Sequence, residues 1–175
     1  MPDNQKINQL LEKVEKLKKE GQLDLSSDED LSIAIMNLVS IEEHFFFTAS
    51  KTGKEKYFDM LFHVREIRKE LLARIVKNPE GEEWCISKHL LAASMRLIEV
   101  GTKYLTDGKK EEAQSMFSKA YDLYSLFWGI NLKLIDIGEV KAIDEDKINV
   151  HDKSNGDLME KLNDLVQKLI DCCKE

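Results

Sequence analysis

Apolar residues recur in steps of three and four along most of this 175-residue chain. Such spacing places them on one side of an α-helix, because the helix has a period of 3.6 residues. Only 2 prolines and 8 glycines are present to interrupt the pattern. We therefore expect an all-α protein built from long helices.

Six segments have the helical pattern, and polar stretches separate them. The expected helices cover residues 4–20, 29–49, 54–76, 82–105, 109–134 and 157–172. Gly53 and Gly108 mark two tight breaks, and helices joined by short connections run antiparallel. The sequence predicts an antiparallel helical bundle of two helix hairpins, a four-helix core, with amphipathic helices at the N- and C-terminal ends.

Composition divides the chain into four parts. Residues 1–25 form an amphipathic N-terminal helix and linker, 26–135 the four-helix core, 136–156 a polar linker and 157–175 a C-terminal amphipathic helix. The last part has a coiled-coil-like seam, made of Leu158, Leu162, Leu165, Leu169 and Cys172. Short amphipathic helices are marginal alone. We expect the terminal helices to pair on the core or to exchange between the chains of a homodimer.

Charge and composition exclude several classes of protein. The net charge of −7 makes the chain as a whole a poor match for nucleic acid. No apolar run of 18 residues is present, so no membrane partner is expected, and the N-terminus lacks the apolar core of a signal peptide. Three cysteines make no disulfide framework. These features predict a cytoplasmic protein.

Residues 94–125 have a pattern of small and large apolar residues at fixed offsets. The pattern consists of Leu97, Val100, Gly101, Tyr104, Gly108, Glu112, Ala113, Phe117 and Ala120. It resembles a tetratricopeptide repeat, in which two helices approach closely at the small residues. Leu97 replaces the repeat's Trp, and Ser125 replaces its closing proline. The resemblance implies a repeat-like hairpin inside a bundle, because repeat arrays need about three or more units.

Glu42 lies in the middle of an apolar helix face. The apolar members of that face are Leu31, Ile35, Leu38, Phe45 and Ala49. A carboxylate there either has a structural role, paired with an Arg or Tyr from a facing helix or placed at a hydrated gap in the core, or it acts as a general base or metal ligand. His63 is the residue best placed to approach Glu42 across the first hairpin. These two residues form a candidate buried polar site, for which we expect no cofactor.

Other motifs for chemistry are missing from the sequence. It contains no Gly-x-Ser-x-Gly, no phosphate-binding loop and no Glu-x-x-His. Cys85 and His89 are four residues apart, a spacing that arises readily by chance. We therefore assign no catalytic residue and no metal ligand.

Two surfaces are open to two interpretations each. Lys54, Arg65, Arg68 and Lys69 form either a solvated face with Glu partners or a surface for phosphate or an acidic partner. The face of helix 29–49 opposite Glu42 is also apolar and contains Ile33, Met36 and Phe47. Either a terminal helix covers that face, or it binds a partner.

These observations favour a non-enzymatic helical protein that acts in protein–protein interaction or as a scaffold, with a protein partner or self-association. One alternative is a metal-binding or hydrolytic bundle centred on Glu42 and His63. A second alternative is a nucleic-acid accessory protein that uses the basic third helix.

Overall fold

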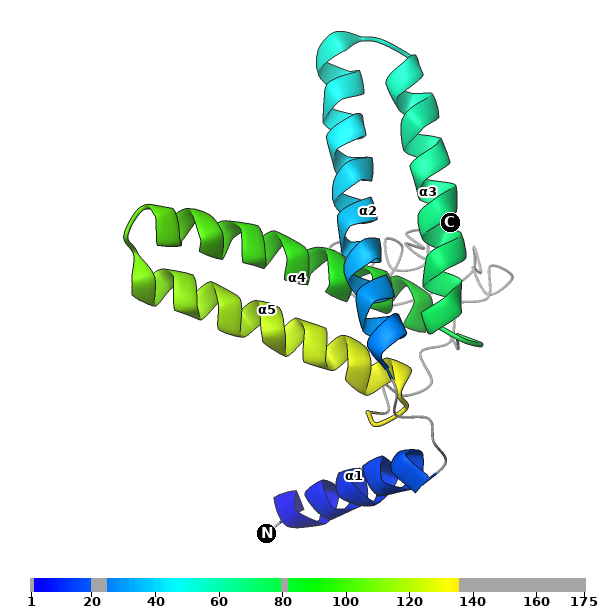
Figure 1. Ribbon diagram of the computed structural model, residues 1–175, viewed down its shortest axis with the longest axis vertical. Helices are drawn as coiled ribbons and strands as arrows, with labels where there is room; N and C mark the ends of the chain where they lie inside the picture. The colour runs from blue at the N-terminus through cyan, green and yellow to red at the C-terminus, as the bar shows by residue number, and fades with distance from the viewer. Residues whose placement is uncertain (1, 20–24, 80–81, 136–175) are drawn as a thin grey trace, which may run out of the picture.

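The computed structural model describes residues 2–19, 25–79 and 82–135, and this part of the chain contains five α-helices and no strand. The helices are α1 (Pro2–Lys19), α2 (Ser26–Thr52), α3 (Lys56–Ile75), α4 (Glu83–Thr106) and α5 (Lys110–Asn131) (Figure 1). The prediction of an all-α helical bundle is confirmed. The predicted linker 136–156 and C-terminal helix lie outside the described residues.

A glycine lies in each of the two tight turns. Gly53 has a φ of 64°, and its N–H donates to the carbonyl oxygen of Ala49 at 2.8 Å. Gly108 has a φ of 76°, and its N–H donates to the carbonyl oxygen of Leu105 at 3.1 Å. Glycine adopts positive φ without the steric penalty of a Cβ atom. Both turns therefore reverse the chain within a few residues.

The two hairpins share a base and diverge from it. α2 packs along α3, α4 packs along α5, and α2 also contacts α4. Figure 1 shows the hairpins spreading apart towards their turns. One fully buried apolar side chain comes from each helix at the base: Ile35, Leu72, Leu91 and Phe127 are each 0% exposed. The core therefore lies where the hairpins meet, and the far half of each hairpin extends away from it.

Small residues bring α4 and α5 close together. A Cβ atom added to the buried Gly101 would lie 2.5 Å from Cε1 of Phe117. Ala113 and Ala120 on α5 are also buried. The side chain of Phe117 thus occupies the space that Gly101 leaves free, as expected from the sequence pattern. The relationship of this hairpin to tetratricopeptide repeats stays a prediction.

The helix α1 is joined to the hairpins by few contacts. The ammonium group of Lys13 donates to the carbonyl oxygen of Lys133 at 3.3 Å. Ile7, Leu10 and Leu11 remain exposed on α1. Among the described residues, no helix is long and apolar enough to cross a membrane.

Replacing Gly101 with alanine should destabilise the protein. Alanine favours a helix by about 1 kcal/mol over glycine, but the added methyl group collides with the ring of Phe117. Overpacking costs about 1–3 kcal/mol, so we expect a net loss of up to roughly 2 kcal/mol in the free energy of unfolding, measured by urea denaturation.

Thr102→Ala is the matched control, because Thr102 is the exposed neighbour of Gly101 on α4. The second variant, Gly101→Ala with Phe117→Leu, should recover part of the loss because leucine is smaller than phenylalanine. A Gly101→Ala protein more stable than the unmodified chain would show that α4 and α5 are not this close.

Candidate functional site

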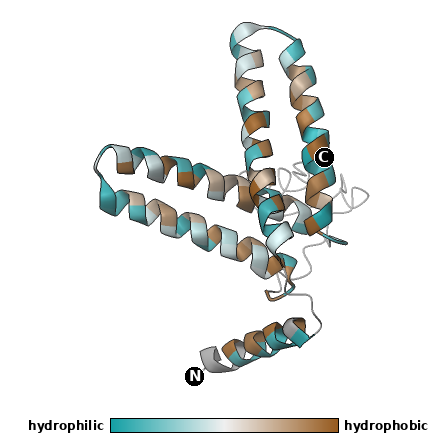
Figure 2. Ribbon diagram, in the orientation of Figure 1, coloured by the Kyte–Doolittle hydropathy of each residue, from teal (hydrophilic) through white to brown (hydrophobic). Residues whose placement is uncertain are grey.

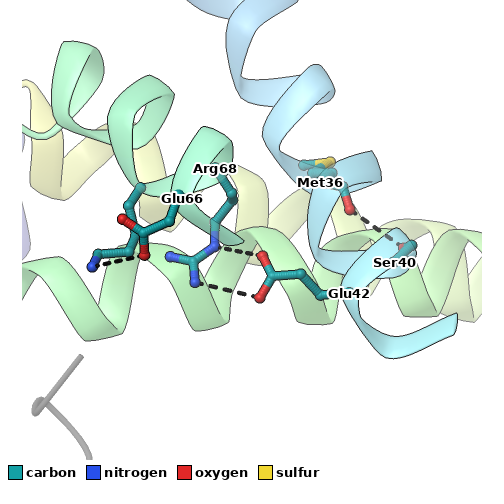
Figure 3. Close-up of polar contacts among 6 residues, drawn as sticks. Met36, Ser40, Glu42, Glu66 and Arg68 are labelled. Carbon is teal, nitrogen blue, oxygen red and sulfur yellow. Dashed lines mark hydrogen bonds and ion pairs between the residues drawn. The ribbon is translucent and has the colours of Figure 1, made fainter. Parts of the chain in front are cut away.

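Glu42 and Arg68 form an ion pair inside the first hairpin. Nε of Arg68 donates to Oε1 of Glu42 at 2.8 Å, and Nη2 donates to Oε2 at 3.5 Å (Figure 3). The side chain of Arg68 is 2% exposed and that of Glu42 is 14% exposed. The guanidinium therefore meets both carboxylate oxygens away from bulk water, the geometry of a bidentate charge-assisted pair.

The pair explains why a carboxylate is tolerated on the apolar face of α2. A buried charge is costly unless a partner of opposite charge and hydrogen bonds compensate it. Arg68 supplies both, which was one of the two interpretations of Glu42. Because the guanidinium occupies both carboxylate oxygens, Glu42 is poorly placed to act as a base or a metal ligand.

Arg68 does not belong to the predicted basic surface, because the structure buries it. The sequence did contain a signal for this. Arg68 lies at helical spacing from Leu61, Val64, Leu72 and Ile75, the apolar stripe that α3 turns towards α2. An arginine on an apolar stripe opposite a glutamate on another stripe indicates a buried pair rather than a solvated face.

The other predicted site residues lie apart from the pair. His63 is exposed, so it does not join Glu42 in a buried site. Lys54 is exposed and Arg65 is half-buried, while Nζ of Lys69 donates to Oε1 of Glu66 at 3.3 Å (Figure 3). Cys85 is buried and His89 is exposed, so they form no dyad. Among the described residues, no group of three or more His, Cys, Asp or Glu side chains is placed to hold a metal ion.

A groove separates the hairpins where α2 diverges from α4. Its volume is about 470 Å³, and Ile41, Phe47 and Met95 contribute apolar side chains to its lining. Arg96 of α4 forms ion pairs with Glu43 across the groove and with Glu99 on its own helix. The groove thus combines an apolar wall with charged groups that already have partners. We call it the inter-hairpin groove.

Several aromatic side chains of the first hairpin face solvent. Phe46 and Phe47 lie edge to face with ring centroids 5.3 Å apart, and both are about half exposed. Phe58 and Phe62 on α3 are exposed as well. The sequence pattern places Phe47 on a second apolar face but does not predict the exposure of the other three rings. The run Phe45–Phe47 was the signal, because successive helical residues point about 100° apart and cannot all enter one core.

The second apolar face of α2 is covered only in part. Met36 belongs to the buried core, whereas Ile33 and Phe47 remain exposed. Phe47 lines the inter-hairpin groove together with Met95 and Arg96 of α4. The N-terminal helix α1 therefore does not provide the cover that was expected from a terminal helix.

Glu42→Gln should destabilise the protein strongly, because it removes the charge of the carboxylate that the buried guanidinium of Arg68 contacts at 2.8 Å. Removing one partner of a buried pair costs on the order of 3–5 kcal/mol. The measurement is the free energy of unfolding in urea at pH 7. Glu66→Gln is the matched control: it breaks an exposed pair on the same hairpin and should change the value by less than about 1 kcal/mol.

A double replacement of both partners tests the same interpretation from the other direction. Glu42→Leu with Arg68→Met removes both charges and should be less destabilising than Glu42→Gln alone. If the Glu42→Gln protein were as stable as the unmodified protein, or more stable, the ion pair with Arg68 would not explain why α2 tolerates a carboxylate on its apolar face.

Comparison of the chain with protein-family models, with curated protein sequences and with solved structures gives no match. Its function is therefore inferred from its own contacts and exposed surfaces.

Proposed function

We propose that this protein is a non-enzymatic helical scaffold that binds a protein partner through the first hairpin. The observation that supports this most is the exposure of four phenylalanine rings on α2 and α3, one of which, Phe47, lines the inter-hairpin groove. The set consists of Phe46, Phe47, Phe58 and Phe62. Exposed apolar patches on soluble proteins mark interaction sites, and aromatic residues are enriched in the cores of protein interfaces.

The form of the surface favours a helical segment as the ligand. The inter-hairpin groove runs between two helices, and its apolar lining comes from Ile41, Phe47 and Met95. Amphipathic helices bind such grooves by inserting apolar side chains at helical spacing. The ion pair of Arg96 with Glu43 at the groove holds α2 against α4. A partner helix would therefore meet a surface that is largely pre-formed.

The two alternative functions receive less support from the contacts. A metal-binding or hydrolytic site at Glu42 would have to compete with Arg68, which already binds the carboxylate at 2.8 Å. Arg68 cannot contribute to a nucleic-acid surface on α3, because its side chain is buried. The charge of Lys69 is balanced by an ion pair with Glu66. Both alternatives thus lack a group that they require.

The test compares partner capture by the full chain and by a variant of the aromatic surface. Phe46→Ser with Phe47→Ser removes two exposed rings that contribute little to the core, so the fold should persist. We expect the unmodified chain to capture a protein partner, or to self-associate at micromolar concentration, and the double variant to lose this by at least about ten-fold, which is 1.4 kcal/mol.

The matched control is Leu105→Ser, which removes an equally exposed apolar side chain at the tip of the second hairpin. This variant should capture the same partner as the unmodified chain. If the unmodified chain neither captures a partner nor self-associates, or if both variants behave alike, the proposed surface is incorrect.

A further inference from the structure

An apolar groove lies beside the end of the described chain. Its volume is about 500 Å³. Leu10 of α1, Leu25 before α2, Tyr121 and Trp128 of α5, and Ile135 contribute to its lining. This groove, which we call the terminal groove, is separate from the inter-hairpin groove and lies at the opposite end of α5 from the Gly108 turn.

The apolar stripe of α1 borders the terminal groove and is open to solvent. Ile7 is 50% exposed, Leu10 is 39% exposed and Leu11 is 57% exposed. Figure 2 shows hydrophobic and hydrophilic residues alternating along α1, which lies apart from the two hairpins. In proteins, most of the stability of an amphipathic helix such as α1 comes from tertiary packing of its apolar face. The exposed stripe therefore needs a further apolar surface.

The chain itself contains a segment with the matching chemistry. Residues 157–175 lie outside the described residues, and their sequence has the seam Leu158, Leu162, Leu165, Leu169 and Cys172. In a helix, the seam from Leu158 to Cys172 would rise about 21 Å. The stripe from Ile7 to Leu17 rises about 15 Å. The two apolar surfaces are thus of comparable length.

The charges of the two segments are complementary. α1 contains five lysines and three acidic residues, whereas residues 157–175 contain five acidic residues and three lysines. Opposite net charge steers two surfaces together and fixes their orientation more than it adds affinity. The affinity would come from the apolar seam. This combination favours α1 over the acidic remainder of the protein as the partner of residues 157–175.

The connecting residues are long enough for the contact to form within one chain. Residues 136–156 reach up to about 70 Å when fully extended, and α1 is only about 27 Å long. A segment tethered in this way meets its site at an effective concentration on the order of millimolar. At micromolar protein concentration, the intramolecular contact therefore prevails over the contact with a second copy.

We propose that residues 157–175 form an amphipathic helix that packs its leucine seam into the terminal groove, between α1 and α5 of the same chain. This helix completes the cover of α1. The proposal does not depend on the partner surface of the first hairpin, which lies on other residues.

The fluorescence of Trp128 reports on the terminal groove. The sequence has two tryptophans, so Trp84→Phe leaves Trp128 as the sole reporter. In that background, Leu162→Glu with Leu165→Glu should shift the Trp128 emission to longer wavelength, because the groove fills with water. Asn163→Glu with Gln167→Glu is the matched control. It adds the same charge at positions off the seam and should leave the emission unchanged.

The thiols give a second measurement that needs no tryptophan substitution. Cys172 lies on the seam and Cys173 lies beside it, and adjacent helical residues do not share a face. In the full chain, Cys172 should react with a maleimide about ten-fold more slowly than Cys173. The Leu162→Glu, Leu165→Glu variant should lose this difference, and peptide mass spectrometry distinguishes the two sites.

Equal emission of the seam variant and its control, or equal labelling of Cys172 and Cys173 in the unmodified chain, would overturn the proposal. Sedimentation velocity separates the intramolecular contact from exchange between two copies. A monomer with the protected Cys172 supports the proposal, whereas a dimer that loses the protection on dilution contradicts the intramolecular contact.

Discussion

The contact of four apolar side chains at the base of the hairpins is the feature on which the rest of this structure depends. Ile35, Leu72, Leu91 and Phe127 come from four different helices and are all fully buried. Burying each such side chain contributes about 1.5–3 kcal/mol. Beyond this contact, each helix is held mainly by its hairpin partner. The hairpins can therefore diverge, and their divergence creates the inter-hairpin groove.

Polar contacts fix the arrangement that the apolar core permits. The hydroxyl groups of Ser32 on α2 and Tyr124 on α5 lie 2.7 Å apart and connect the two hairpins. The ion pair of Arg96 with Glu43 connects α2 to α4. Within the first hairpin, removing one partner of the Glu42–Arg68 pair strongly destabilises the fold. The intact pair nevertheless stabilises the fold less than apolar side chains in the same places would. Together these contacts select one alignment of the helices.

Much of the fold was predictable from local pattern, because helices and turns depend on neighbours in sequence. The spacing of apolar residues predicted the described helices to within a few residues, and Gly53 and Gly108 predicted both turns. The close approach at Gly101 also followed from residue size. The divergence of the hairpins could not be predicted in this way. The angle between them depends on how Ile35 and Phe127 meet, and no local sequence pattern encodes that angle.

The site was predictable only in part, for a related reason. The apolar face around Glu42 indicated a buried carboxylate, and an arginine was among its expected partners. Assigning that role to Arg68 required placing it on the stripe of α3, whereas its basic neighbours suggested a surface. The exposed phenylalanines were harder to predict, since burial depends on which faces the other hairpin covers.

The most direct test of this account is hydrogen exchange on a Phe127→Ala variant. Removing this ring should cost about 3–5 kcal/mol. If the shared core joins both hairpins, amide protection should fall by a similar factor in α2, α3, α4 and α5. A loss confined to α4 and α5, with α2 and α3 unchanged, would show that the hairpins are independent and would contradict the account.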